Sequence, residues 1–190
     1  MSKIGIASMG AMGSTLAYSL LRCGHEVFYA SQGRSDKTIK NATDLGVTDL
    51  VDIGKLFSTC DFVFCISRGG SWRGLATEAL NSRYAGVYVD FNGLHENDID
   101  DINDMFHDSG VNYVDAALRA WPISEHREIP EKGTEAYENF EPRTMYLTGE
   151  KSNLVRELFD DFWVINECQP PSKYVVIDIA RIKQIENQPI

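Results

Sequence analysis

The sequence predicts an α/β fold built on a doubly wound, mostly parallel sheet. Three observations lead to this prediction. Short apolar runs alternate with amphipathic stretches, a glycine-rich turn follows the first apolar run, and 43% of the 190 residues are apolar, enough to bury a core. We expect one domain over residues 1–168 and a short C-terminal tail over residues 169–190.

The first half of the chain alternates strand with helix. The apolar run at 3–8 predicts a strand, and the apolar stripe at 15–23 predicts a helix that Gly24 ends. EVFYA at 26–30 predicts a second strand, and DFVFCIS at 61–67 predicts a buried strand because its apolar run is almost continuous. Further helices are expected at 35–45, in a short stretch that ends at 56–58, and at 72–81.

The second half continues the pattern and then changes. Strands are expected at 86–91, 111–114, 143–148 and 162–166, and helices at 97–109 and 151–159. Residues 123–142 are polar and acidic and contain two prolines, so we expect a surface loop, here called the flap, over 118–142. The apolar tail at 172–188 is expected to be a helix or a strand that packs on its own domain or on a second subunit, which makes it a candidate for homodimer contacts.

Composition excludes several classes of partner. Lys and Arg number 18 and Asp and Glu 28, so the net charge of −10 disfavours nucleic acid and anionic membranes. No run approaches the roughly 18 apolar residues of a membrane span, and the N-terminus lacks the layout of a signal peptide, so a cytoplasmic protein is expected. The four cysteines form no C-x-x-C pair and the four histidines show no metal-ligand spacing. We therefore expect free, buried thiols and no metal site.

The strongest chemical signal is the turn between the first strand and the first helix. It consists of Ser8, Met9, Gly10, Ala11, Met12 and Gly13. A dinucleotide-binding turn of the Rossmann type has the pattern G-x-G-x-x-G, and here Ser8 takes the place of the first glycine. Backbone N–H groups at the helix start would then hold a pyrophosphate. The alternative is a tight turn that binds nothing.

The residues after the second expected strand bear on the choice of cofactor. An NAD site usually has Asp or Glu there, but this chain has Ala30 and Ser31, followed by Arg34 and Ser35. Hydroxyls and a guanidinium suit the 2′-phosphate of NADP, so NADP is expected rather than NAD. The alternative is a surface arginine beside a helix N-cap at Ser35.

Several segments, in order, resemble one known family. They are IGIASMGAMGSTLA at 4–17, YASQGRSDKTIKNATDLGV at 29–47, DFVFCIS at 61–67, YVDFNG at 88–93 and VNYVDAA at 111–117. Over residues 3–168 the chain resembles the N-terminal NAD(P)-binding domain of the β-hydroxyacid dehydrogenases. That superfamily includes 6-phosphogluconate dehydrogenase, 3-hydroxyisobutyrate dehydrogenase and the imine reductases. The details resemble most a branch of 6-phosphogluconate-dehydrogenase-like, NAD-binding proteins.

The resemblance implies roles at the nicotinamide and substrate ends. Ser67 and Asn92 would border the nicotinamide ribose and ring, although Asn92 also fits a simple turn residue before Gly93. Where the family has a D-A-P-V-S-G-G-like stretch that grips a carboxylate, this chain has Arg119 and Trp121. Arg119 would hold a carboxylate with Trp121 as a lid, or would pair with the acidic flap.

Catalysis is where the chain departs from the family. The resemblance implies a second, helical domain that supplies a lysine, and we expect this chain to lack it, since the nearest lysines are Lys173 and Lys183. His126 and Tyr137 are candidate substitutes, and the catalytic residue stays unassigned. The prediction is an NADP-dependent oxidoreductase acting on a small carbonyl, hydroxy acid or imine. The alternatives are an inactive dinucleotide-binding module, serving as a sensor or a partner subunit, and a structural protein.

Overall fold

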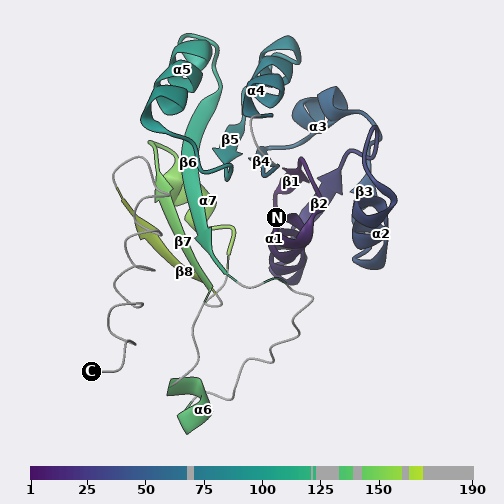
Figure 1. Cartoon of the computed structure of the whole chain (residues 1–190), viewed down its shortest axis with the longest axis vertical. Helices are drawn as coiled ribbons and strands as arrows, with labels where there is room; N and C mark the ends of the chain where they lie inside the picture. The colour runs from purple at the N-terminus through teal and green to yellow at the C-terminus, as the bar shows by residue number, and fades with distance from the viewer. Residues whose placement is uncertain (68–70, 121, 123–132, 139–142, 160–162, 169–190) are drawn as a thin grey trace, which may run out of the picture.

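The fold is an eight-stranded sheet with helices on both faces (Figure 1). The computed structural model describes residues 1–67, 71–120, 122, 133–138, 143–159 and 163–168. The sheet order is β3-β2-β1-β4-β5-β6-β7-β8. The strands are β1 (Lys3–Ile6), β2 (Glu26–Tyr29), β3 (Thr48–Asp49), β4 (Phe62–Cys65), β5 (Val87–Asp90), β6 (Asn112–Arg119), β7 (Arg143–Thr148) and β8 (Trp163–Glu167).

Helices connect most of the strands. They are α1 (Ala11–Arg22), α2 (Asp36–Asp44), α3 (Ile53–Thr59), α4 (Trp72–Asn81), α5 (Glu96–Phe106), α6 (Glu135–Glu138) and α7 (Ser152–Arg156). Strands β1 to β6 pair in parallel, β7 is antiparallel to β6, and β8 is parallel to β7. The predicted α/β class with a doubly wound, mostly parallel sheet is therefore confirmed.

The path of the chain creates a crevice beside β1. From β1 the chain proceeds outward to β2 and β3, then returns to β4 on the other side of β1 and continues to β8. The direction of winding thus reverses between β1 and β4. In open α/β sheets, ligands bind at the carboxyl ends of the strands at such a reversal point.

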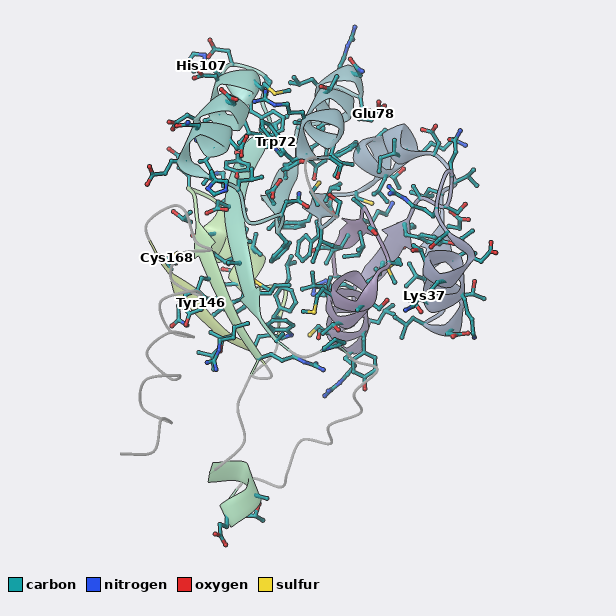
Figure 2. All side chains as sticks on the ribbon, in the orientation of Figure 1. Lys37, Trp72, Glu78, His107, Tyr146 and Cys168 are labelled. Carbon is teal, nitrogen blue, oxygen red and sulfur yellow. The ribbon has the colours of Figure 1, made fainter. Side chains whose placement is uncertain are left out.

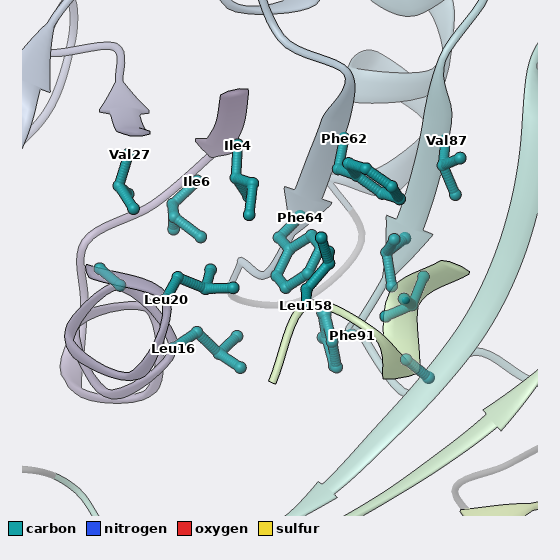
Figure 3. Close-up of a cluster of buried hydrophobic side chains, with 14 of the residues drawn as sticks. Ile4, Ile6, Leu16, Leu20, Val27, Phe62, Phe64, Val87, Phe91 and Leu158 are labelled. Atoms are coloured by element: carbon teal, nitrogen blue, oxygen red, sulfur yellow. The ribbon is translucent and has the colours of Figure 1, made fainter. Parts of the chain in front are cut away.

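Alternation along the strands divides the core into two layers. Ile4, Ile6 and Phe64 face α1 and pack with Leu16 and Leu20 (Figure 3). The opposite face carries residues such as Val63 and Tyr88, which pack under α3, α4 and α5. Both faces are apolar because a parallel sheet is covered by helices on both sides.

Several predicted boundaries were wrong. Helix α1 begins at Ala11 instead of Thr15. Its first turn lies within the glycine-rich turn, where the apolar stripe that predicted the helix has not yet begun. Strand β6 continues to Arg119 instead of ending at Val114, because antiparallel pairing with β7 extends it. Leu118 and Arg119 are therefore strand, and the flap predicted over 118–142 does not begin at Leu118. The helix expected at 151–159 is shorter, at Ser152–Arg156.

Other differences concern short elements and cysteines. The two-residue β3 and the four-residue α6 were not predicted, because elements of this length carry little periodicity. All four cysteines are free, but only Cys60 and Cys65 are buried, whereas Cys23 and Cys168 are half-buried. The tail at 172–188 lies outside the described residues. Within the described residues, no helix has the length and apolar character that crossing a membrane requires.

Candidate dinucleotide-binding site

The turn after β1 presents an uncapped helix start. The N–H of Ala7 donates to the carbonyl of Phe64 at 3.0 Å, which holds the end of β1 against β4. Gly10 is the N-cap of α1, no side-chain hydrogen bond caps the helix, and its first turn has no acidic residue. The N–H groups and the positive end of the helix dipole are therefore available to an anion.

The two glycines of the turn have different roles. A Cβ built on Gly13 would lie 1.8 Å from the carbonyl oxygen of Ser8, so Gly13 allows α1 to approach the turn. A Cβ at Gly10 would meet no atom within 4 Å, so the space beside Gly10 is open. These are the roles of the third and second glycines in a dinucleotide-binding turn.

The remaining residues of the turn differ in exposure. The Met9 side chain is buried in the core, and its carbonyl accepts hydrogen bonds from Ser14 Oγ at 3.2 Å and Asn41 Nδ2 at 2.9 Å. Only the backbone of Met9 thus belongs to the turn. Ser8 and Met12 are half-buried and Ala11 is exposed.

The loop after β2 is held in place by Asp49, at the end of β3. Its Oδ1 accepts the N–H of Ser31 at 3.1 Å and the N–H of Val51 at 2.7 Å. Burial acts to raise the pKa of Asp49, but the hydrogen bonds from Ser31 and Val51 outweigh it, so the net effect is a lowered pKa. Ser35 caps α2 by accepting the N–H of Thr38 at 3.4 Å, as the alternative interpretation of Ser35 expected.

A cavity of about 350 Å³ joins this loop to the crevice between β1 and β4. Its lining includes Ala7, Gln32, Arg34, Ile53, Ser67 and Glu78. The structure thereby brings the predicted residues Arg34 and Ser67 into one cavity. The Arg34 Nε atom is buried and has no hydrogen-bond partner in the structure. Glu78, labelled on α4 in Figure 2, contributes a carboxylate to the same cavity.

A hydrogen-bond network links the ends of β4 and β5. Asn92 Oδ1 accepts the N–H of Ser67 at 2.7 Å and the Ser67 hydroxyl at 2.8 Å. Asn92 Nδ2 donates to the carbonyl of Cys65 at 3.2 Å and to Asp90 Oδ2 at 3.1 Å, and the Asn92 N–H donates to Asp90 Oδ1 at 2.7 Å. Asn92 is followed by Gly93 at φ +64°, so it occupies a turn and also joins the two strand ends.

The candidate substrate residues are only partly placed. Arg119 is half-buried at the end of β6, opposite Thr144 of β7. Because β6 is parallel to β5, Arg119 lies toward the same sheet edge as Asn92. Trp121 and His126 lie outside the described residues. Tyr137 belongs to the short helix α6.

Fold and turn together define the class: a Rossmann-type domain for binding dinucleotides. A family model described as the NAD binding domain of 6-phosphogluconate dehydrogenase matches residues 3–134. The match covers more than half of the chain, and the chain belongs to this family. The resemblance deduced from the sequence is therefore confirmed. Among curated proteins, none matches the chain.

Solved structures show the same fold at low identity. The 3-hydroxyisobutyrate dehydrogenase of Mycobacterium tuberculosis is 17% identical with a TM-score of 0.71, and the match covers 98% of this chain and 62% of that one. An imine reductase from Myxococcus stipitatus is 15% identical with a TM-score of 0.70, covering 97% of this chain and 60% of that one. A conserved protein of unknown function, described as structurally similar to 3-hydroxyacid dehydrogenases, is 21% identical with a TM-score of 0.72. The match covers 94% of this chain and 62% of that one. The chain thus spans about three fifths of the length of these structures.

Sequence reasoning missed four residues that shape the site. Gln32 and Glu78 line the cavity, Asp49 holds the loop after β2, and Asp90 bonds to Asn92. The signal for Asp90 was present, because an acidic residue that ends a buried strand beside an asparagine needs a hydrogen-bond partner. Glu78 gave no signal, since a glutamate on an amphipathic helix is usually solvated.

Proposed function

We propose that the chain binds NADP(H), with the pyrophosphate at the start of α1 and the adenosine end beside Arg34. The buried, unpartnered Arg34 Nε in the wall of the 350 Å³ cavity is the observation that carries the proposal. A guanidinium in that position favours a phosphate ligand, because it forms charge-assisted hydrogen bonds. At the 2′ position of the adenosine ribose NADP carries a phosphate, whereas NAD carries a hydroxyl.

We also propose the class of reaction. The chain would serve as the cofactor half of an oxidoreductase that acts on a small carbonyl, hydroxy acid or imine. Membership of the family supports this class. Arg119, which ends β6 at the edge of the sheet that carries Asn92, is the candidate to hold a substrate carboxylate.

A dinucleotide-binding module without catalysis is the second candidate. The described residues that line the cavity and end β4, β5 and β6 include no group assigned to handle the substrate proton, and this favours the module. Positioned acid–base catalysis contributes roughly 10²- to 10⁴-fold in rate, so its loss leaves slow chemistry. Such a module would act as a sensor or as the subunit of a larger assembly.

Titration of the protein with NADPH and with NADH tests the proposal. Binding is monitored by the quenching of tryptophan fluorescence and by the fluorescence of the nicotinamide. Micromolar NADPH binding with weaker NADH binding is the expected result. Gly10→Trp should abolish binding, because its indole would fill the open space beside Gly10. Asp104→Trp, on the exposed side of α5, is the matched control and should bind normally. Normal binding by Gly10→Trp would refute the site.

A screen of carbonyl and imine substrates separates the two candidates. Turnover of NADPH with any of them, lost in Gly10→Trp and kept in Asp104→Trp, supports the oxidoreductase. Tight NADPH binding without turnover across the screen supports the module.

A further inference from the structure

The ends of three neighbouring strands bring two carboxylates together behind Asn92. In the sheet register, Cys65 of β4 pairs with Asp90 of β5, and Asp90 pairs with Asp115 of β6. Asp90 is 0% exposed and Asp115 is 2% exposed. A carboxylate buried this deeply beside another is costly unless hydrogen bonds or an opposite charge compensate it.

The task of Asp90 is visible in its hydrogen bonds. Both carboxylate oxygens accept from Asn92, one from its backbone N–H and one from its side-chain Nδ2. Together with the hydrogen bond from Asn92 Nδ2 to the carbonyl of Cys65, this arrangement sets which way the Asn92 amide points. Its Oδ1 atom is thereby turned toward Ser67, where it accepts two hydrogen bonds.

We propose that Asp90 is a positioning residue of the cofactor site, whose ionised carboxylate orients the Asn92 amide so that Asn92 holds Ser67 in place for the nicotinamide end of the dinucleotide. The proposal rests on the proposed dinucleotide-binding function. It assigns Asp90 no contact with the cofactor, because the residue acts only through Asn92.

Protonation of Asp90 disturbs this arrangement. A carboxylic acid has one donor, and a donor on Oδ2 would oppose the N–H₂ group of Asn92. Protonation therefore weakens the hold of Asp90 on the Asn92 amide, and an amide that rotates would turn its N–H₂ group toward the N–H of Ser67, which would then lose its acceptor. Binding of the nicotinamide end should therefore weaken when Asp90 takes up a proton.

The surroundings place this protonation within an accessible range. Burial, and to a smaller extent the charge of Asp115, raise the pKa of Asp90 to about 7 against the hydrogen bonds from Asn92. Among the described residues, the other titratable groups facing Asp90 are Cys65, Tyr88 and Tyr113, whose pKa values burial also raises, so they stay neutral. Helices α4 and α5 cover this face with uncharged core residues: Trp72, Leu75, Ala76, Ala79, Ile99, Ile102 and Phe106.

The test compares two ligands across pH. NADPH carries the nicotinamide end, and adenosine 2′,5′-bisphosphate lacks it but keeps the 2′-phosphate. From about pH 8.5 to about pH 5.5, wild type should lose about tenfold in NADPH affinity beyond any loss for the bisphosphate. Asp90→Asn, the neutral isostere, should bind NADPH about tenfold more weakly at pH 8 without this extra pH dependence. Its affinity for the bisphosphate should fall less than its affinity for NADPH, because the bisphosphate shares the cavity of Arg34 and Ser67 but has no nicotinamide end.

Two further arms keep the proposal falsifiable. Asp115→Asn should move the midpoint of the NADPH profile to lower pH, because it removes a charge that raises the pKa of Asp90. Should Asp90→Asn fail to fold, the side-chain N–H₂ resonances of Asn92 in ligand-free wild type must still shift with a midpoint near pH 7. Resonances that do not move, or equal pH profiles for the two ligands, overturn the proposal. Failure of wild type to bind either ligand refutes the dinucleotide function itself.

Discussion

The carbonyl oxygen of Ser8 lies directly against the Cα of Gly13, so that a Cβ on Gly13 would be only 1.8 Å from it. This contact joins the start of the turn to the first residues of α1. It explains why the turn requires glycine at position 13, where the reason is close packing and not an unusual backbone angle.

Gly13→Ala should therefore force α1 away from the turn. We expect the free energy of unfolding to fall by about 1–3 kcal/mol, as for other overpacked sites, and NADPH affinity to fall at least tenfold, roughly. Denaturant unfolding and NADPH titration measure the two effects. Gly10→Ala is the control, because its Cβ meets no atom within 4 Å, and it should change stability by less than about 1 kcal/mol. Equal stability of the two variants would contradict the packing role of Gly13.

Arg34→Ala should separate the two cofactors. Loss of charge-assisted hydrogen bonds to the 2′-phosphate should weaken NADPH binding by about 10- to 100-fold, while NADH changes by less than about threefold. Calorimetry with both cofactors measures the difference. Lys40→Ala is the control, because it removes the same charge from the exposed surface of the neighbouring helix α2, where Lys40 pairs with Asp44. An equal loss for NADPH and NADH in Arg34→Ala would place the 2′-phosphate elsewhere.

His25 should make the fold less stable in acid. Its Nδ1 accepts the N–H of Ser2 at 3.2 Å and its Nε2 lies 3.0 Å from the carbonyl oxygen of Leu158, which fits the neutral ring. Burial lowers the pKa of His25 below its ordinary value of 6.5, so the unfolded chain takes up a proton before the folded one. The free energy of unfolding should therefore fall as pH decreases from about 7.5 through the lowered pKa.

Unfolding curves of wild type and His25→Gln at several pH values test this. The difference between the two proteins should shrink as pH falls from about 7.5 to about 5, since glutamine does not titrate. His107→Gln, at an exposed histidine on the far end of α5, is the control and should follow wild type. Parallel curves for wild type and His25→Gln would show that His25 does not contribute.

A buried hydrogen bond should couple β8 to α1. Trp163 Nε1 donates to Ser19 Oγ at 3.0 Å, although the two residues are 144 positions apart in the chain. In a double-mutant cycle, Trp163→Phe and Ser19→Ala should show a coupling energy of about 1 kcal/mol. Trp163→Phe combined with Thr77→Ala, on the opposite face of the sheet, should be additive within about 0.5 kcal/mol. A coupling no larger than this control would mean that the bond adds no stability.

The sequence predicted the features that depend on neighbouring residues. The turn at 8–13 could be deduced because the spacing of its glycines is a pattern within six consecutive residues. Ser35 could be expected to cap α2 because serine is a preferred N-cap residue. The apolar runs that become β1, β4 and β5 were found because strands buried on both faces carry a continuous signal. Family resemblance then added Ser67 and Asn92, whose link across two strands no local pattern contains.

The tertiary structure alone decided how distant parts meet. The antiparallel pairing of β7 with β6, the extension of β6 to Arg119, and the cavity that joins Arg34 to Glu78 all depend on sheet order and register. The environment of Asp90 could not be predicted from sequence either. Asp90 is buried between Cys65 and Asp115 only because β4, β5 and β6 align in the sheet. The amino-acid sequence by itself determined the class of fold and the place of the glycine-rich turn, since both arise from local backbone geometry. Contacts between side chains far apart in the chain, such as the hydrogen bonds of Asn92 with Ser67, were decided by packing.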